Sequence, residues 1–149
     1  MLCRGLRGAT TAESNTAEAI LSATCDLLRR LIAANDLHPA DVASAIFTTS
    51  PDLSAAYPAA AARALGWHDV APLDAQEIDV PGGVPRCIRV LIHWNTEKQA
   101  YDLVHVYLNG AAGLRPDRAT PGTPDARARS GGISTGTEGG TGYDYRDAT

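Results

Sequence analysis

The sequence QEIDVPGGVPRCIRV at Gln76–Val90 joins the end of one apolar segment to the start of a strand. Ile88, Val90 and Ile92 occur at every second position, which is the spacing of side chains on one face of a β-strand. Arg89 lies between them and is therefore expected to project from the opposite face. The pattern predicts a strand that turns apolar side chains toward a core and a guanidinium away from it.

Glu77 lies at the end of the preceding apolar segment, and the short connection PGGVP at Pro81–Pro85 separates it from Arg89. Proline and glycine in such a connection are typical of a tight turn. A guanidinium on a strand and a carboxylate on a nearby strand end could flank a small anionic ligand. Two such residues more often form a structural ion pair, so both interpretations remain open for this stretch alone.

Working outward, further segments have the apolar or β-branched character of strands. The expected strands cover 2–7, 45–49, 70–77, 88–94 and 102–108. Gly8 to Thr11 is expected to end the first strand, and Pro72 favours an edge position or a strand start for the third. In the last strand, Leu103, His105 and Tyr107 are expected to face one way and the residues between them the other.

Helical segments alternate with these strands. The expected helices cover 16–34, a short turn from 39 to 42 and a second helix from 58 to 66. Asn15 is the expected N-cap of the long helix, with Glu18 completing a capping box, and Pro58 opens the second helix. This mixed order predicts an α+β domain over 1–117, in which helices flank a mixed β-sheet.

The composition changes at Arg118. Residues 118–149 hold 7 of the 14 glycines, and Ile133 is their only aliphatic residue larger than alanine. Such a segment cannot bury enough apolar surface to offset the entropy lost on ordering. We therefore expect a disordered tail over 118–149, outside the folded domain.

The net charge of −4 over 149 residues gives no general basic field, so nucleic acid is not expected as a partner. Three cysteines without paired spacing (Cys3, Cys25 and Cys87) fit a reducing compartment better than a disulfide framework. The first residues lack the apolar core of a signal peptide, and no apolar run approaches the ~20 residues that span a bilayer. We expect a cytoplasmic protein without a membrane partner.

No metal-ligand spacing links the four histidines, and His93 and His105 are expected to be ordinary, partly buried imidazoles rather than a pair. No nucleophile with a suitable base stands out. The remaining candidates are four arginines and one tyrosine on or near strands and helices: Arg7, Arg63, Arg89, Arg115 and Tyr107. Each is typical of a surface position, but together they could bind a compact dianion through bidentate contacts.

Four stretches make the sequence similar to a known family. They are RGLRGATTAE at Arg4–Glu13, PDLSAAYPAAAAR at Pro51–Arg63, QEIDVPGGVPRCIRV at Gln76–Val90 and HVYLNGAAGLRPD at His105–Asp117. In this order and without large gaps, they resemble the monofunctional AroH class of chorismate mutases. The resemblance covers about residues 1–117 and leaves the tail uncovered.

The resemblance implies that chorismate is rearranged to prephenate in an intramolecular Claisen-type step, without a cofactor or a metal. It implies a homotrimer with a barrel-like core of sheets, helices outside and active sites at the subunit interfaces. By motif position, Arg7 would hold a substrate carboxylate and Glu77 would meet the ring hydroxyl. Arg89 would contact the ether oxygen and a carboxylate, and Tyr107 would bind a carboxylate.

The resemblance also assigns residues to the rim of the site. Tyr57 and Arg63 would come from the neighbouring subunit, while Leu114 and Arg115 would close the site. The sequence differs from the family pattern at three positions: Tyr57 replaces the usual Phe, Ala60 stands where some members have Lys, and Asp74 stands where Cys or Ser is usual. A carboxylate at 74 would either repel a dianionic substrate or carry a proton.

Two other functions remain open on the sequence. A trimeric imine deaminase has a related architecture with interfacial arginines, but its own motifs do not occur in this sequence. A trimer that binds an aromatic precursor as a sensor, without turnover, is the other alternative. Asp74 is the residue that keeps this second alternative open.

Overall fold

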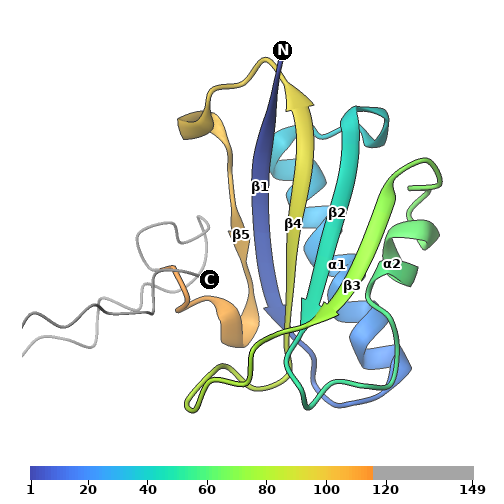
Figure 1. Cartoon of the computed structure of the whole chain (residues 1–149), viewed down its shortest axis with the longest axis vertical. Coiled ribbons are helices and arrows are strands. Elements are labelled where there is room, and N and C mark those ends of the chain that lie inside the picture. Colours follow the sequence, from blue (N-terminus) through green and yellow to red (C-terminus); the bar gives the residue numbers. More distant parts are fainter. Residues whose placement is uncertain (116–149) are drawn as a thin grey trace, which may run out of the picture.

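The computed structural model describes residues 1–115 of the chain. The domain boundary expected at 117 and the tail expected over 118–149 lie outside these residues. Within them, five strands form one mixed sheet in the order β3-β2-β4-β1-β5, and two α-helices cover one of its faces (Figure 1). We call the other face, which points away from both helices, the open face.

The elements have the following bounds: β1 Leu2–Thr11, α1 Ala17–Asn35, β2 Val42–Thr49, α2 Ala59–Ala64, β3 Ala71–Gln76, β4 Cys87–Thr96 and β5 Val106–Tyr107. Three short 3-10 helices cover Pro39–Asp41, Ala100–Asp102 and Asn109–Ala111. β4 runs antiparallel to both of its neighbours, whereas β5 and β3 pair in parallel with β1 and β2. The α+β class with a mixed sheet and flanking helices is thus confirmed, and the sheet of this single chain is open, with no closed barrel among residues 1–115.

β4 is the central strand, and its alternation sorts the two faces of the sheet. Ile88, Val90 and Ile92 are at most 3% exposed and pack in the layer between the sheet and the helices. Arg89 and Leu91 alternate with them on the open face, where they are half-buried. The expected orientation of Arg89 away from the apolar core is confirmed.

β1 continues through Gly8 to Thr11, where the sequence predicted a break. Gly8 serves a close approach rather than a turn. A Cβ on Gly8 would lie 2.8 Å from a Cδ1 atom of Leu31 on α1, so a larger residue would force the buried Leu31 side chain to shift. The extension brings Ala9 into register beside Arg89 and therefore lengthens the wall of the open face near that residue.

The N-cap of α1 is Thr16, one residue later than predicted. Its hydroxyl accepts a hydrogen bond from the backbone N–H of Ala19 at 3.2 Å. The Asn15 side chain is occupied elsewhere, because its Oδ1 accepts from the backbone N–H groups of Ser54 and Ala55. Asn15 therefore ties the start of α1 to the loop that leads into α2.

The strand predicted over 102–108 is also wrong in most of its length, because only Val106 and Tyr107 pair as β5. Val104 is instead bonded to Asn35, the fully buried last residue of α1. Asn35 Oδ1 accepts from the Val104 N–H, and Asn35 Nδ2 donates to the carbonyls of Val104 and Leu31, each at 2.9 Å. One side chain thus satisfies backbone groups that a regular strand would have paired, and the predicted alternation is lost.

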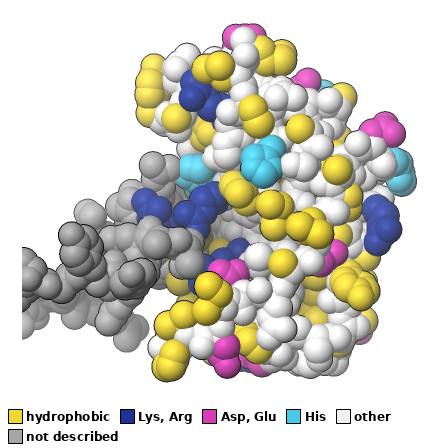
Figure 2. All heavy atoms as spheres, in the orientation of Figure 1, with side chains coloured by type: hydrophobic (Ala, Val, Ile, Leu, Met, Phe, Trp, Pro, Cys, Tyr) yellow, Lys and Arg dark blue, Asp and Glu magenta, His cyan; other side chains and the backbone are white. Residues whose placement is uncertain are grey.

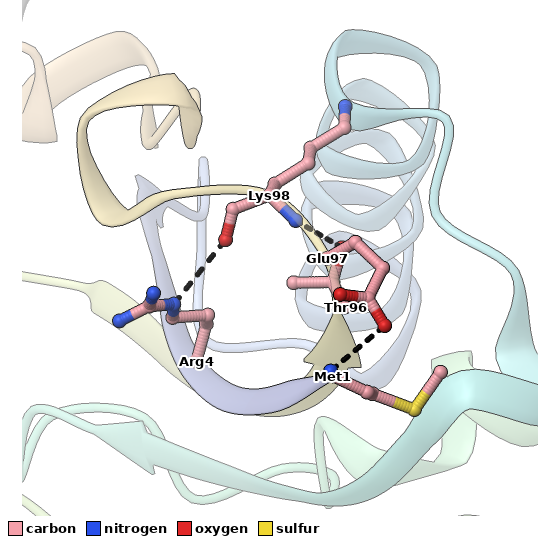
Figure 3. Close-up of polar contacts among 5 residues, drawn as sticks. All are labelled: Met1, Arg4, Thr96, Glu97 and Lys98. Carbon is pink, nitrogen blue, oxygen red and sulfur yellow. Dashed lines mark hydrogen bonds and ion pairs between the residues drawn. The ribbon is translucent and has the colours of Figure 1, made fainter.

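Lys98 closes the same end of α1. Its Nζ donates to the carbonyl of Asn35 at 2.7 Å and lies 5.6 Å from the ring centroid of Trp94. Its backbone carbonyl accepts from Nε of Arg4, and the amino group of Met1 pairs with Glu97 at 2.8 Å (Figure 3). These contacts join the start of β1 to the end of β4.

Neither α-helix of residues 1–115 is both long and apolar enough to cross a membrane.

We predict that Asn35→Ala lowers the free energy of unfolding by about 3 kcal/mol, because it leaves buried backbone groups of Val104 without partners. Urea unfolding followed by circular dichroism measures the change, with the m-value expected to stay constant. Arg29→Ala, at an exposed position of the same helix, is the control. Equal stability of the two variants would show that solvent replaces the Asn35 side chain.

Candidate active site

Arg89 and Glu77 meet on the open face of the sheet. Arg89 Nη1 lies 3.5 Å from Glu77 Oε1, and the two side chains are 19% and 23% exposed. Glu77 follows directly after β3, where its backbone N–H donates to the carbonyl of Thr49 at 2.8 Å. Arg89 is held at the middle of the sheet by β4. Opposite charges thus come together on a surface from which most water is excluded, and each offsets the desolvation of the other.

Part of the Arg89 guanidinium has no partner within residues 1–115. Its Nε is buried and unbonded there, and the same holds for the hydroxyl of Thr48, the residue that pairs with Arg89 across β2 and β4. Buried polar atoms in folded proteins are nearly always hydrogen-bonded. Two neighbouring polar groups that are buried without a hydrogen-bond partner are typical of a surface where a ligand supplies the missing partners.

A cavity of about 420 Å³ lies over these groups. Its charged and hydroxyl-bearing lining residues come from all five strands or their ends: Arg7, Thr48, Glu77, Arg89 and Tyr107. Leu114 and the apolar part of β1 and β4 complete it. In the face that Figure 2 shows, basic side chains gather beside a hollow in the molecule. The volume and the mixed lining suit a small polar ligand.

Arg7 is aimed into this cavity by β1 and by His105. On β1, Arg7 pairs with Leu91 and lies two residues from Ala9, the partner of Arg89, so both arginines share the open face. The backbone N–H of Arg7 donates to Nδ1 of His105 at 3.0 Å. His105 Nδ1 is therefore unprotonated and replaces a ladder bond that the short β5 does not supply. This role of His105 was not predicted from the sequence, since a lone histidine before Tyr107 gives no pattern.

Tyr107 and Leu114 form the wall beside Arg89. Tyr107 is 3% exposed, pairs with Ala9 in the β1–β5 ladder, and packs in a small cluster with Cys87 and Ala111. Leu114 packs against this cluster from the segment that follows Asn109–Ala111. Arg115 is half-buried and is the last described residue. The cavity lining thus includes Tyr107 and Leu114, and Arg115 directly follows Leu114 in the chain.

Cys87 lies on the same face as Arg89, two positions earlier on β4. Burial raises the pKa of its thiol, and the Arg89 guanidinium acts against that rise. A neutral, 3% exposed thiol is a packing group and not a nucleophile. It forms part of a second cavity of about 370 Å³, which shares Thr48, Glu77 and Arg89 with the first.

The connection between Glu77 and Arg89 covers that second cavity. Its end is fixed by Ser50 and Asp52: the Ser50 hydroxyl accepts from the Cys87 N–H at 2.8 Å, and Asp52 Oδ2 accepts from the Arg86 N–H at 2.8 Å. The hydrogen bond from the Ser50 hydroxyl lowers the pKa of Asp52. The predicted PGGVP turn includes Gly82 at a φ of +81°. These contacts fix the start of β4 and hence the position of Arg89, which lies two residues after Cys87.

Three predicted site residues lie elsewhere in the chain. Tyr57 and Arg63 are exposed beside and on α2, and neither lines the cavity that contains Arg89. Asp74 is on β3 but on the face opposite to Glu77, where its Oδ1 accepts from the N–H of Ala59 at 3.0 Å. The fold of one chain therefore brings together Arg7, Glu77, Arg89, Tyr107 and Leu114, and keeps Tyr57, Arg63 and Asp74 apart from them.

Two of the histidines have separate partners. His93 Nδ1 bonds to the hydroxyl of Ser44 at 2.8 Å, whereas His105 Nδ1 accepts from Arg7. Within residues 1–115, no group of three or more His, Cys, Asp or Glu side chains is arranged to hold a metal ion. The polar chemistry of the site is that of arginine, glutamate, threonine and tyrosine.

Comparison with known proteins identifies this arrangement. The family model described as chorismate mutase type I matches residues 3–118. The chain belongs to this family of chorismate mutases. A chorismate mutase of Thermus thermophilus is 48% identical over 117 residues, which is 78% of this chain and 96% of the relative. The corresponding protein of Bacillus subtilis is 44% identical over 118 residues, 78% of this chain and 93% of the relative.

A solved chorismate mutase structure from Clostridium thermocellum shares the fold. It aligns with a TM-score of 0.71 at 49% identity and covers 72% of this chain and 96% of its own length. The residues matched by the family model, 3–118, include the whole sheet except Leu2 at the start of β1, and every residue of the Arg89 cavity. The resemblance drawn from the four sequence stretches is therefore confirmed at the level of the family.

We predict that His105→Ala speeds amide hydrogen exchange at Arg7 by about threefold to tenfold. The reason is that the Arg7 N–H loses its acceptor, and one such bond contributes roughly 1 kcal/mol. Exchange followed by NMR at fixed pH measures the rate. His93→Ala is the matched control, because its Nδ1 bonds to a side chain and not to the backbone of β1. An unchanged Arg7 rate would mean that the pairing of β1 with β4 and β5 holds this part of β1 without the His105 bond.

Proposed function

We propose that this chain rearranges chorismate to prephenate, as an isomerase of aromatic amino acid biosynthesis. Membership of the chorismate mutase family supports the activity. The observation in the site that carries the proposal is Arg89, a largely buried guanidinium on the central strand, with an unbonded Nε and Glu77 opposite. Three free cysteines fit a cytoplasmic location.

The first task of the site is to hold the substrate in a compact conformation. Chorismate carries two carboxylates, and the rearrangement needs its side chain folded over the ring. Arg7 and Arg89 line one cavity of about 420 Å³ and present guanidinium groups of the kind that bind carboxylates in pairs of hydrogen bonds. Tyr107 adds a phenolic hydroxyl, while Leu114 and Arg115 close the side. Fixing the reacting atoms in this way lowers the barrier by orientation.

The second task is to stabilise the charge that develops as the C–O bond breaks. The ether oxygen becomes more negative in the transition state than in bound chorismate. A guanidinium already fixed at that position stabilises the transition state more than the ground state, which is what raises kcat. Arg89 suits this task, because β4 fixes its backbone and Glu77 holds one of its nitrogens, leaving Nε for the ligand.

Glu77 has a second role besides its pairing with Arg89. Its other carboxylate oxygen is directed to the ring hydroxyl of chorismate, which orients the ring relative to Arg89. The backbone bond from Glu77 to Thr49 at 2.8 Å limits the movement of this carboxylate. No proton transfer or covalent intermediate is needed, since the rearrangement is intramolecular.

We also propose that the active assembly is a homotrimer with a barrel-like core and interfacial sites. In this arrangement Tyr57 and Arg63 of one chain complete the cavity of another, which explains their distance from Arg89 within a single chain. Large apolar side chains support a covered surface near β3: Tyr57, Leu73, Ile78 and Val80 are between 59% and 78% exposed in one chain. An exposed apolar group of this kind is typical of an interface.

We predict that replacing Arg89 by the neutral, near-isosteric citrulline lowers kcat about a hundredfold or more. Losing one preorganised donor at a developing charge typically costs roughly 3 kcal/mol of transition-state stabilisation. The decrease in chorismate absorbance, followed over a range of substrate concentrations, gives kcat and KM. Wild-type protein that leaves chorismate unchanged would refute the proposed activity itself.

The control is citrulline at Arg30, an exposed residue of α1 whose guanidinium pairs with Asp26 at 3.8 Å. An exposed pair of this kind contributes about 1 kcal/mol or less to stability, so kcat should not change. If the Arg89 variant kept a normal kcat and only KM rose, Arg89 would be a substrate-binding residue and not the group that stabilises the ether oxygen.

We predict that two inactive variants restore activity when they share a trimer. Arg63→Ala chains and Arg89→Ala chains are unfolded together and refolded as a mixture. If Arg63 acts in a neighbour's cavity, some interfaces in mixed trimers combine a wild-type Arg63 with a wild-type Arg89. Turnover of the mixture, compared with each variant refolded alone, measures the effect. Mixed trimers without turnover would show that both residues serve one chain's cavity.

A further inference from the structure

Asp74 carries the one side-chain acceptor within residues 1–115 that reaches the start of α2 from the sheet. Its Oδ1 accepts from the backbone N–H of Ala59, the first residue of the helix, at 3.0 Å. The N-cap residue, Pro58, makes no side-chain capping bond. The first helical N–H therefore depends on a carboxylate that lies fifteen residues further along the chain.

α2 is a short helix with a small buried side. It covers only Ala59–Ala64, and a helix of this length is not stable by itself. Its buried side consists of Ala59, Ala61 and Ala62, so it packs through single methyl groups. A charge-assisted bond to the helix start is stronger than a neutral one, and the negative charge also suits that end of the helix. The Asp74 contact therefore acts together with the core packing of Leu65 and Trp67, which follow the helix, in fixing α2 beside β3.

The alternation of β3 turns Asp74 away from the Arg89 cavity of its own chain. Asp74 is in register with Phe47, which is 0% exposed in the layer beneath the helices. Its neighbour Ala75 is in register with Thr48, which lines the cavity on the open face. The carboxylate at 74 therefore belongs to the helix layer and serves the helix that carries Arg63.

We infer that Asp74 is a positioning residue for the proposed chorismate mutase reaction. By holding the first N–H of α2, it fixes where Tyr57, just before the helix, and Arg63, in its last turn, are placed beside β3. The inference rests on the proposed role of Arg63 in a neighbouring cavity. It assigns to Asp74 an effect on substrate binding that passes through α2 and involves no contact between Asp74 and chorismate.

The test is a double-mutant cycle in the full-length protein, with chorismate as the substrate. Asp74→Ala is expected to lower kcat/KM about tenfold, mainly through KM, because Arg63 loses its position. In an Arg63→Ala background, the same substitution is expected to have almost no further effect, since the residue that it positions is already absent. Asp74→Asn keeps an acceptor oxygen and is expected to stay within about twofold of the wild type.

Each result decides the matter. An equal loss from Asp74→Ala in both backgrounds, or a large loss with Asp74→Asn, would overturn the inference and favour direct contact with the substrate. A lower melting temperature with unchanged kcat/KM would overturn it as well, leaving Asp74 a purely structural role. Arg63→Ala with full activity would refute the interfacial assignment first, which separates the two failures.

Two further variants serve as a control and as a replacement for the alanine variant. Gln76→Ala changes an exposed residue two positions along β3 and is the matched control, expected to keep both kinetic constants. Asp74→Leu keeps the branching of the side chain at Cγ without an acceptor, and replaces the alanine variant if circular dichroism shows that the latter is unfolded. Asp74→Asn gives a decisive result in either case.

Discussion

A guanidinium that is 19% exposed has lost most of its water, and the sheet is arranged so that Arg89 can remain charged there. β4 keeps the side chain out of the apolar layer by placing it on the open face. The β3–β2–β4 order then brings the end of β3 close enough for Glu77 to pair with it at 3.5 Å. Thr48 on β2 lies between the two in the register. The cavity lies on the open face beside this Arg89–Glu77 pair.

Much of the fold could be predicted, because side-chain periodicity is written into the sequence. Local patterns predicted three features: the alternation around Arg89, the edge position of β3, which contains Pro72, and the start of α2 at Pro58. Two predictions failed for non-local reasons. Gly8 looked like a strand end, but it allows Leu31 of α1 to approach the sheet. Only two residues of the strand expected over 102–108 form a strand, because the backbone of Val104 is hydrogen-bonded to the Asn35 side chain.

The candidate site divides in the same way. Arg89 and Glu77 could be found from strand pattern and turn length. Arg7 and Tyr107 were candidates from their places on expected strands, whereas Leu114 entered through the family resemblance. The structure places all five at one cavity. His105 could not have been found, since its part is to accept a backbone bond from a distant strand. The resemblance assigned Asp74 to the rim of the site, yet one position along a strand decides which face a side chain joins, and 74 and 77 differ by an odd number.

The position of Lys98 has a practical consequence for studying assembly. Twelve arginines accompany this single lysine in the sequence, and its Nζ is bonded to the Asn35 carbonyl and lies beside the Trp94 ring. The amino group of Met1 is paired with Glu97. Amine-reactive crosslinkers such as glutaraldehyde depend on free lysines at an interface, so they will under-report the oligomers of this protein. Its subunit number is better measured by sedimentation or by native mass spectrometry, which need no reactive side chain.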